Sequence, residues 1–278
     1  MTTFPSDESQ HRLVEEFKTA ARSMTVGFMK LRRQGEAVED ADPSGTGTLV
    51  RVGKVAGILT ASHVLDQLAK SGQVGLMRIT DRPDQPQKVK MEMDQTERLT
   101  FGRHPFGALG PDLSFLRLPE DLAGWLDAMN GFLNLEMRRT RMLASPDAEP
   151  YNDALIGVIA ERTRKLAGSE QDPVVETSSL ITSGKVVATL LAHGLDVLHF
   201  RDSLPPEKRP GSYQGTSGGG LWRMYLGADL HSVRDRCLVG VAFYEFKDDG
   251  RMTVVCHGPE AIYGAMVNAI RQKWPGAA

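Results

Sequence analysis

The sequence predicts a mostly β protein in which two antiparallel β-barrels pack side by side, with one helix before, one between and one after them. Short apolar runs recur along most of the chain, and Gly, Pro and Asp separate them. Such runs are typical of antiparallel sandwiches and barrels. A helical segment near the middle divides the runs into two groups. Hydrophobic residues make up 41% of the 278 residues, which is ordinary for a globular protein with a buried core.

The first part of the chain predicts a helical extension over 1–24, followed by the first barrel over 25–118. The apolar residues of the extension recur at helical spacing; they are Leu13, Phe17, Ala20, Ala21 and Met24. The predicted strands of the first barrel are 25–31, 47–52, 55–60, 74–79, 89–93 and 113–118.

A connecting segment is expected over 119–152, and it contains the second helix. Pro119 begins this helix, acidic residues occupy its first turn, and Gly131 ends it. The predicted apolar face consists of Leu122, Trp125, Leu126 and Met129. No element is assigned over 131–150.

The second barrel is expected over 153–257, and a carboxyl-terminal helix over 258–278. The predicted strands are 154–160, 174–176, 185–191, 196–200, 219–225, 237–246 and 252–256. Pro259 and Glu260 begin the helix. Its stripe at every fourth position is expected to pack into the core; the stripe consists of Ile262, Met266, Ile270 and Trp274.

Charge and cysteine content indicate a cytoplasmic protein that binds neither nucleic acid nor membranes. The formal net charge is -2, which gives no broad attraction to polyanions. The amino terminus has no secretory signal, and no apolar run is long enough to span a bilayer. Cys237 and Cys256 are expected to be buried free thiols, which fits a reducing compartment.

Three segments contain the residue types that hydrolysis of an amide through a serine ester requires. The reaction needs a base, an acid that fixes the tautomer of the base, and a hydroxyl nucleophile with donors for the oxyanion. His63 follows the run 55–60, and Asp112 immediately precedes 113–118. Ser217 lies in a glycine-rich stretch, where the backbone can approach a substrate closely. Each segment adjoins a predicted strand, so a barrel can direct the three side chains into one cleft.

The same segments resemble the trypsin/chymotrypsin family of serine peptidases. Residues 60–65 (Thr-Ala-Ser-His-Val-Leu) resemble the family's Thr-Ala-x-His motif, and 112–118 resemble its aspartate segment. Residues 215–219 (Gly-Thr-Ser-Gly-Gly) are similar to its nucleophile loop. The resemblance implies a chymotrypsin-like double barrel and a serine endopeptidase that acts on proteins or peptides without metal or cofactor. It implies His63 as base, Asp112 as orienting acid, Ser217 as nucleophile, and the amides of Gly215 and Ser217 as oxyanion hole.

The chain departs from that family at two places. Thr216 stands where secreted members have an aspartate that pairs with a newly released amino terminus, so activation by that route is not expected. Regulation by a protein partner that orders the loop 201–216 is a hypothesis. Gly211 stands where trypsin has the aspartate of its P1 pocket, the pocket for the residue before the cleaved bond.

The substrate-binding strand of the family corresponds here to residues 241–245. Phe243, Tyr244 and Glu245 are therefore candidate substrate-binding residues. Glu245 either restores a preference for Arg and Lys at the mouth of the P1 pocket or faces solvent on an alternating strand.

Three other interpretations remain at this point. Residues 215–219 also match the G-x-S-x-G elbow of α/β-hydrolases, with Asp235 or Asp248 as acid and His257 as base, although the proline-rich stretch before it is unlike a buried strand. A catalytically silent or partner-gated protease-like fold could bind peptides. A zinc site would use His193, His199, His231, His257 and the cysteines, but none of these has close ligand spacing.

Overall fold

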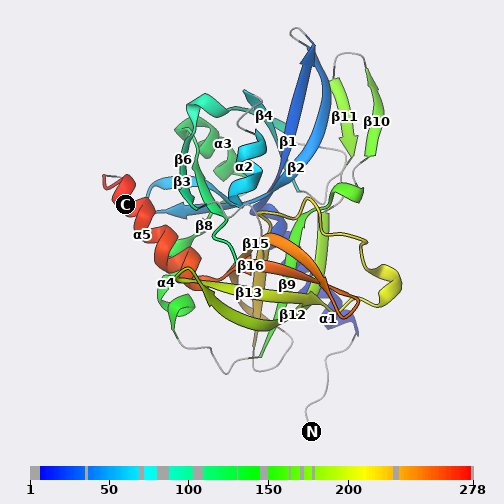
Figure 1. Ribbon diagram of the computed structural model, residues 1–278, viewed down its shortest axis with the longest axis vertical. Helices are drawn as coiled ribbons and strands as arrows, with labels where there is room; N and C mark the ends of the chain where they lie inside the picture. Colours follow the sequence, from blue (N-terminus) through cyan, green and yellow to red (C-terminus); the bar gives the residue numbers. More distant parts are fainter. Residues whose placement is uncertain are drawn as a thin grey trace.

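Strands dominate the computed structural model of the chain (Figure 1). It describes residues 7–34, 37–68, 72–79, 88–102, 109–129, 131–144, 150–162, 164–169, 172–176, 179–227 and 232–276. Within these ranges, side chains are described except at 7–14, 32–34, 37–41, 162–169 and 172–176.

The first sheet is built from the first part of the chain, in the order β5-β4-β1-β2-β3-β7-β6. Its strands are β1 (Thr25–Gln34), β2 (Ala37–Val52), β3 (Val55–Thr60), β4 (Gln73–Arg78), β5 (Lys88–Glu92), β6 (Glu97–Phe101) and β7 (Leu113–Arg117). All neighbours in this order pair antiparallel, and a short strand β8 (Leu133–Asn134) pairs parallel with β2. The continuous apolar run of β3 reflects burial of all its residues, and the strand pairs with β2 on one side and β7 on the other.

The second sheet closes on itself as a six-stranded barrel, in the order β12-β13-β16-β15-β14-β9. Its strands are β9 (Tyr151–Val158), β12 (Ser179–Ala192), β13 (Leu195–Asp202), β14 (Gly220–Leu226), β15 (Val233–Asp248) and β16 (Arg251–His257). A separate hairpin of β10 (Arg164–Ser169) and β11 (Asp172–Glu176) lies beside the β1–β2 hairpin (Figure 1).

The helices lie around and between the two sheets. They are α1 (Asp7–Ser23), α2 (Ser62–Leu68), α3 (Glu120–Met129), α4 (Leu135–Leu143) and α5 (Val267–Lys273), which continues a π-helical segment, η4 (Glu260–Met266). Three short 3₁₀ segments are η1 (Met93–Gln95), η2 (Ala160–Arg162) and η3 (Pro206–Lys208). No helix in the described ranges is both long enough and apolar enough to cross a membrane.

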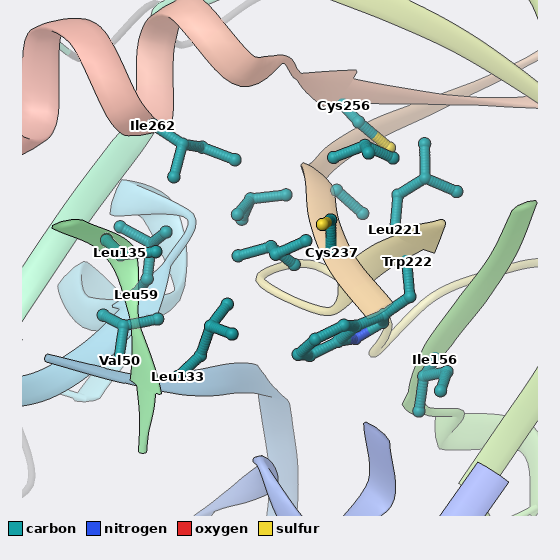
Figure 2. Close-up of a cluster of buried hydrophobic side chains, with 14 of the residues drawn as sticks. Val50, Leu59, Leu133, Leu135, Ile156, Leu221, Trp222, Cys237, Cys256 and Ile262 are labelled. Atoms are coloured by element: carbon teal, nitrogen blue, oxygen red, sulfur yellow. The ribbon is translucent and has the colours of Figure 1, made fainter. Parts of the chain in front are cut away.

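Buried hydrophobic clusters join the two sheets. Val50 and Leu59 from the first sheet belong to the same buried cluster as Leu221, Trp222 and Cys237 from the second (Figure 2). The predicted stripe of the carboxyl-terminal helix is buried in this cluster, with Ile262, Met266 and Ile270 fully inaccessible and Trp274 8% exposed. The helix therefore contributes core rather than a binding face, as predicted.

The predicted fold class is confirmed: the chain is mostly β, with two antiparallel sheets arranged as in a chymotrypsin-like double barrel. Cys237 and Cys256 are buried and free, as predicted. The α/β-hydrolase interpretation is wrong, because the strands around Ser217 pair antiparallel and the chain continues into strand β14 rather than a helix.

Several local predictions need correction. Strands β6, β8 and β10 and helix α4 were not predicted from the sequence. Helix α3 has the expected bounds, but Trp125 and Met129 are 39% and 40% exposed. Ala123 and Leu126 are the buried residues of α3, because the helix contacts the sheet along a narrower strip than its apolar pattern suggested.

Candidate active site

His63 is the second residue of α2, a short helix that begins just after β3 ends. The helix is held in place by groups on neighbouring strands. Ser62 Oγ forms a 2.8 Å hydrogen bond with Ser114 Oγ of β7. Arg98 of β6 donates to Asp66 Oδ1 at 2.6 Å and to the Ser62 carbonyl at 3.0 Å. The imidazole therefore extends from a backbone that is fixed at both ends of one helical turn.

Asp112 precedes β7 and accepts two hydrogen bonds from His63. The His63 amide donates to Oδ1 at 3.0 Å, and the ring Nδ1 lies 2.6 Å from Oδ2. The Asp112 side chain is 10% exposed, whereas the His63 side chain is 39% exposed. The carboxylate is thus enclosed and the imidazole reaches the surface, which is the arrangement expected of an orienting acid and a base that meets substrate.

The electrostatics of this pair keep Asp112 ionised. Burial by itself raises the pKa of Asp112, but the hydrogen bonds from His63 and the interaction with its charge outweigh burial and hold the pKa below its ordinary value. An ionised carboxylate only accepts hydrogen bonds, so His63 Nδ1 carries the proton. The lone pair of the neutral ring then lies on Nε2, on the side away from Asp112.

The loop that carries Ser217 is fixed by backbone hydrogen bonds to both sheets. Thr46 N–H of β2 donates to the Ser217 carbonyl at 2.8 Å, and Gly218 N–H donates to the Ala242 carbonyl of β15 at 2.7 Å. Gly218 has φ +84, and a Cβ there would lie 1.9 Å from the Thr46 carbonyl oxygen. Only glycine fits at this position, because both the backbone conformation and the space exclude a side chain.

The structure brings the Ser217 loop next to the His63 helix. A Cβ on Gly45 would lie 2.7 Å from Val64, which follows His63, and 3.2 Å from the Ser217 carbonyl oxygen. Among the described residues, Ser217 Oγ forms no hydrogen bond with His63 or with another group. In proteins without bound substrate, bonds of this type are often long and shorten only when substrate binds.

The two amides predicted to form the oxyanion hole are available. Within the described residues, neither Gly215 N–H nor Ser217 N–H donates to a protein acceptor. The Gly215 carbonyl is held away from them, because it accepts a 2.8 Å hydrogen bond from Thr46 Oγ1. Free amides at fixed positions can stabilise an oxyanion without reorganising.

A cavity of about 190 Å³ adjoins Ser217. Its lining residues are Tyr213, Gln214, Thr216, Ser217, Ala242, Phe243, Tyr244, Glu245 and Val254. Three of the four predicted substrate-binding residues thus line one cavity with the candidate nucleophile. Gly211 is exposed and does not line it.

Glu245 has a role that neither sequence interpretation described. Its Oε1 accepts a 2.6 Å hydrogen bond from Ser212 Oγ, and its Oε2 accepts one of 2.6 Å from Tyr213 N–H. The side chain is half-buried rather than solvated. Both oxygens accept hydrogen bonds from the loop before Ser217. The carboxylate therefore stabilises that loop and does not face the cavity as an unpaired charge.

Sequence reasoning missed further residues that shape the site. Thr46 Oγ1 donates to the Gly215 carbonyl and also accepts from Val158 N–H at 2.9 Å, so it joins both sheets to the loop that carries Ser217. Tyr213 O–H donates to Asp202 at 2.7 Å, and burial together with this bond raises the Tyr213 pKa above its ordinary value. The glycines on either side of Thr46 were the one signal that could have drawn notice to it.

Metal chemistry finds no support in the described ranges, where no group of three or more His, Cys, Asp or Glu side chains gathers to bind a metal ion. His231 of the zinc interpretation lies outside the described residues.

No family model and no curated protein matches the sequence. Among solved structures, the chain is similar to an HtrA-type protease determined with a decapeptide, at 13% identity and a TM-score of 0.46. That match covers 92% of this chain but only 66% of the protease chain. A structure concerned with the coupled folding and binding of the disordered Sesbania mosaic virus VPg protein is similar at 15% identity and a TM-score of 0.44, over 88% of this chain and 90% of that one.

Proposed function

We propose that this chain is a serine endopeptidase, with His63, Asp112 and Ser217 as catalytic residues. The observation that carries the proposal is the 2.6 Å contact between His63 Nδ1 and an enclosed Asp112, beside a loop that presents Ser217 and two free amides. A binding protein would need neither the oriented imidazole nor the free amides.

In the proposed mechanism, His63 Nε2 takes the proton of Ser217 Oγ as the oxygen attacks a peptide carbonyl. Asp112 holds the ring in the required tautomer and stabilises the imidazolium that forms. The amides of Gly215 and Ser217 donate to the developing oxyanion. His63 then returns the proton to the leaving amine, and water, deprotonated by the same ring, releases the acyl group.

The proposed substrate is a protein or peptide with an uncharged, apolar P1 side chain. The cavity beside Ser217 has Ala242, Phe243 and Val254 among its walls. Glu245 would be the only carboxylate able to attract Arg or Lys there, but both of its oxygens already accept hydrogen bonds from the protein. A basic P1 residue would have to share those oxygens with Ser212 and Tyr213, which weakens the attraction that it gains from the carboxylate.

The proposed site does not depend on release of a new amino terminus. Thr216, which replaces the activation aspartate, is buried and donates through Oγ1 to the Tyr213 carbonyl at 2.7 Å. Control by a protein partner at the loop 201–216 stays a prediction, which limited proteolysis of that loop would test. We also propose a cytoplasmic, reducing location, with which the two free buried thiols are compatible.

The test is covalent labelling of the purified protein with a fluorophosphonate probe, followed by cleavage of a peptide library. Wild-type protein should label, and both Ser217→Ala and His63→Ala should not, while circular dichroism shows all three folded. Absence of labelling in folded wild-type protein would overturn the proposal and favour the peptide-binding interpretation.

A further inference from the structure

A second histidine contacts the proposed acid, at its backbone amide rather than at its carboxylate. We propose that His257 is a positioning residue for Asp112, which holds the backbone of the acid in place from the second barrel. The proposal deepens the proposed function, since it concerns the same site. It assigns His257 no contact with substrate.

The contact joins the two halves of the fold. Asp112 N–H donates to His257 Nε2 at 2.9 Å, across 145 residues of chain. Asp112 comes from the segment before β7 in the first sheet, and His257 is the last residue of β16 in the second. The amide of Asp112 is therefore fixed by one barrel, while its carboxylate binds His63 within the other.

The ring of His257 is enclosed by specific packing. It is fully buried and stacks on Phe243 of β15, with ring centroids 4.2 Å apart and planes inclined by 18°. Gly110, which has φ +61, lies close to the same ring. A Cβ on Gly110 would lie 2.8 Å from His257 Cε1, so the chain before Asp112 can approach the ring only because this residue is glycine. Phe243 thus both lines the substrate cavity and holds the ring.

The chemistry of the contact requires a neutral ring. A protonated imidazole has no lone pair at Nε2 and would repel the Asp112 amide donor. Burial lowers the pKa of His257 to about 4, although the charge of Asp112 acts in the opposite direction. The ring is therefore neutral near pH 7, and the proton lies on Nδ1.

That proton has no hydrogen-bond partner among the described residues. Buried donors without partners are rare, because they lose the hydrogen bonds that water would supply. In His257, Nδ1–H is therefore left without a hydrogen bond, whereas Nε2 accepts one from Asp112 N–H. An apolar side chain would suffice if the residue served only to pack the core. The hydrogen bond at Nε2 therefore indicates that His257 positions Asp112.

The deciding comparison uses two substitutions of His257 in the full chain. In His257→Gln, the amide oxygen can take the place of Nε2 as acceptor. In His257→Leu, a side chain of similar bulk offers no acceptor. His199→Leu is the control, because it removes another histidine that packs on a phenylalanine ring, with its centroid 5.4 Å from that of Phe246 in an edge-on contact, but one that lies on β13 and is only partly buried. Should the Leu variant fail to fold, His257→Asn replaces it, since its shorter side chain does not reach the Asp112 amide.

Two measurements are made on each variant. The first is the proton NMR signal of the hydrogen bond between His63 Nδ1 and Asp112, which requires no catalytic activity. The second is kcat and KM for a cleaved peptide. We expect His257→Leu to shift or broaden the signal and to lower kcat by about 10- to 100-fold with little change in KM, because a small displacement of a catalytic group has effects of this size. His257→Gln should give a signal close to that of the wild-type protein and a kcat within a few-fold of the wild-type value.

An unchanged signal and unchanged kcat in folded His257→Leu would overturn the proposal, as would equal losses in His199→Leu. If wild-type protein proves inactive, the NMR comparison still decides the role of His257. Activity thus tests the proposed function, and the NMR signal tests the role of His257 independently.

Discussion

Replacing Glu245 by alanine should impair cleavage of every substrate to the same degree, whatever its P1 residue. The substitution removes the acceptor of Tyr213 N–H and of Ser212 Oγ. Tyr213 is 3% exposed, so its amide loses its partner with little access to water, whereas Ser212 is only partly buried and can bind water instead. We therefore estimate the lost stability from the Tyr213 N–H bond alone. A hydrogen bond to a charged acceptor contributes about 1.5–3 kcal/mol to stability.

The lost hydrogen bond destabilises the loop that carries Ser217, the proposed nucleophile. The Tyr213 carbonyl accepts from both the amide and the hydroxyl of Thr216, next to Ser217. If the full amount is lost from the ordered loop, its population relative to disordered forms falls about 10- to 150-fold, since 1.4 kcal/mol corresponds to a factor of ten. We expect kcat/KM and the rate of fluorophosphonate labelling to fall by up to that factor.

The assay compares peptides that differ only in their P1 residue, with Leu, Phe, Lys and Arg in turn. Glu207→Ala is the control, because it removes the same charge from the same loop region at an exposed position. Glu245→Gln should retain part of the activity, since its amide oxygen can still accept from Tyr213 N–H. A loss confined to the Lys and Arg peptides would refute this reasoning and make Glu245 a specificity residue instead.

Two further predictions concern stability and labelling. Thr46→Val should lower the free energy of unfolding by about 1–3 kcal/mol and abolish fluorophosphonate labelling, because the buried Val158 N–H and the Gly215 carbonyl lose their partner. Urea unfolding measures the change in stability, and the probe measures labelling. Unchanged labelling would contradict this prediction. Acidification from pH 6.5 to 4 should cost wild type about 3 kcal/mol more stability than His257→Gln, because His257 takes up its proton near pH 6.5 when unfolded but only near pH 4 when folded. Parallel stability curves for the two proteins would contradict this second prediction.

The sequence predicted the elements whose signal is local. Strand β3 and the stripe in the last helix have continuous or strictly periodic apolar residues, and both are buried as expected. Helix α4 escaped prediction because Leu135 and Met142, its two buried residues, are seven positions apart with charged residues between them. Its helix start is marked by Asn134, whose side chain accepts from Met137 N–H at 3.1 Å.

The residues of the candidate site also fall into those that a local sequence pattern predicts and those that it does not. His63 and Asp112 were predicted from short motifs, and the structure brings them into contact. The roles of Glu245 and His257 were beyond sequence reasoning, because each depends on which backbone amide the side chain meets. Those partners, Tyr213 and Asp112, are set by how β15 and β16 lie against distant loops, and no local pattern records that arrangement.

The end of the last helix makes contact with the sheet that carries Asp112. The ring of Trp274 lies 5.9 Å from that of Phe115 in β7, and its Nε1 donates to Glu97 in β6 at 3.1 Å. Because Trp274 is synthesised long after Phe115, this part of the first sheet is not covered until the carboxyl-terminal helix has left the ribosome, after the second barrel. We expect a nascent chain that already displays Ser217 to remain incompletely folded until this helix has emerged, which delays any proteolytic capacity until synthesis has passed Trp274.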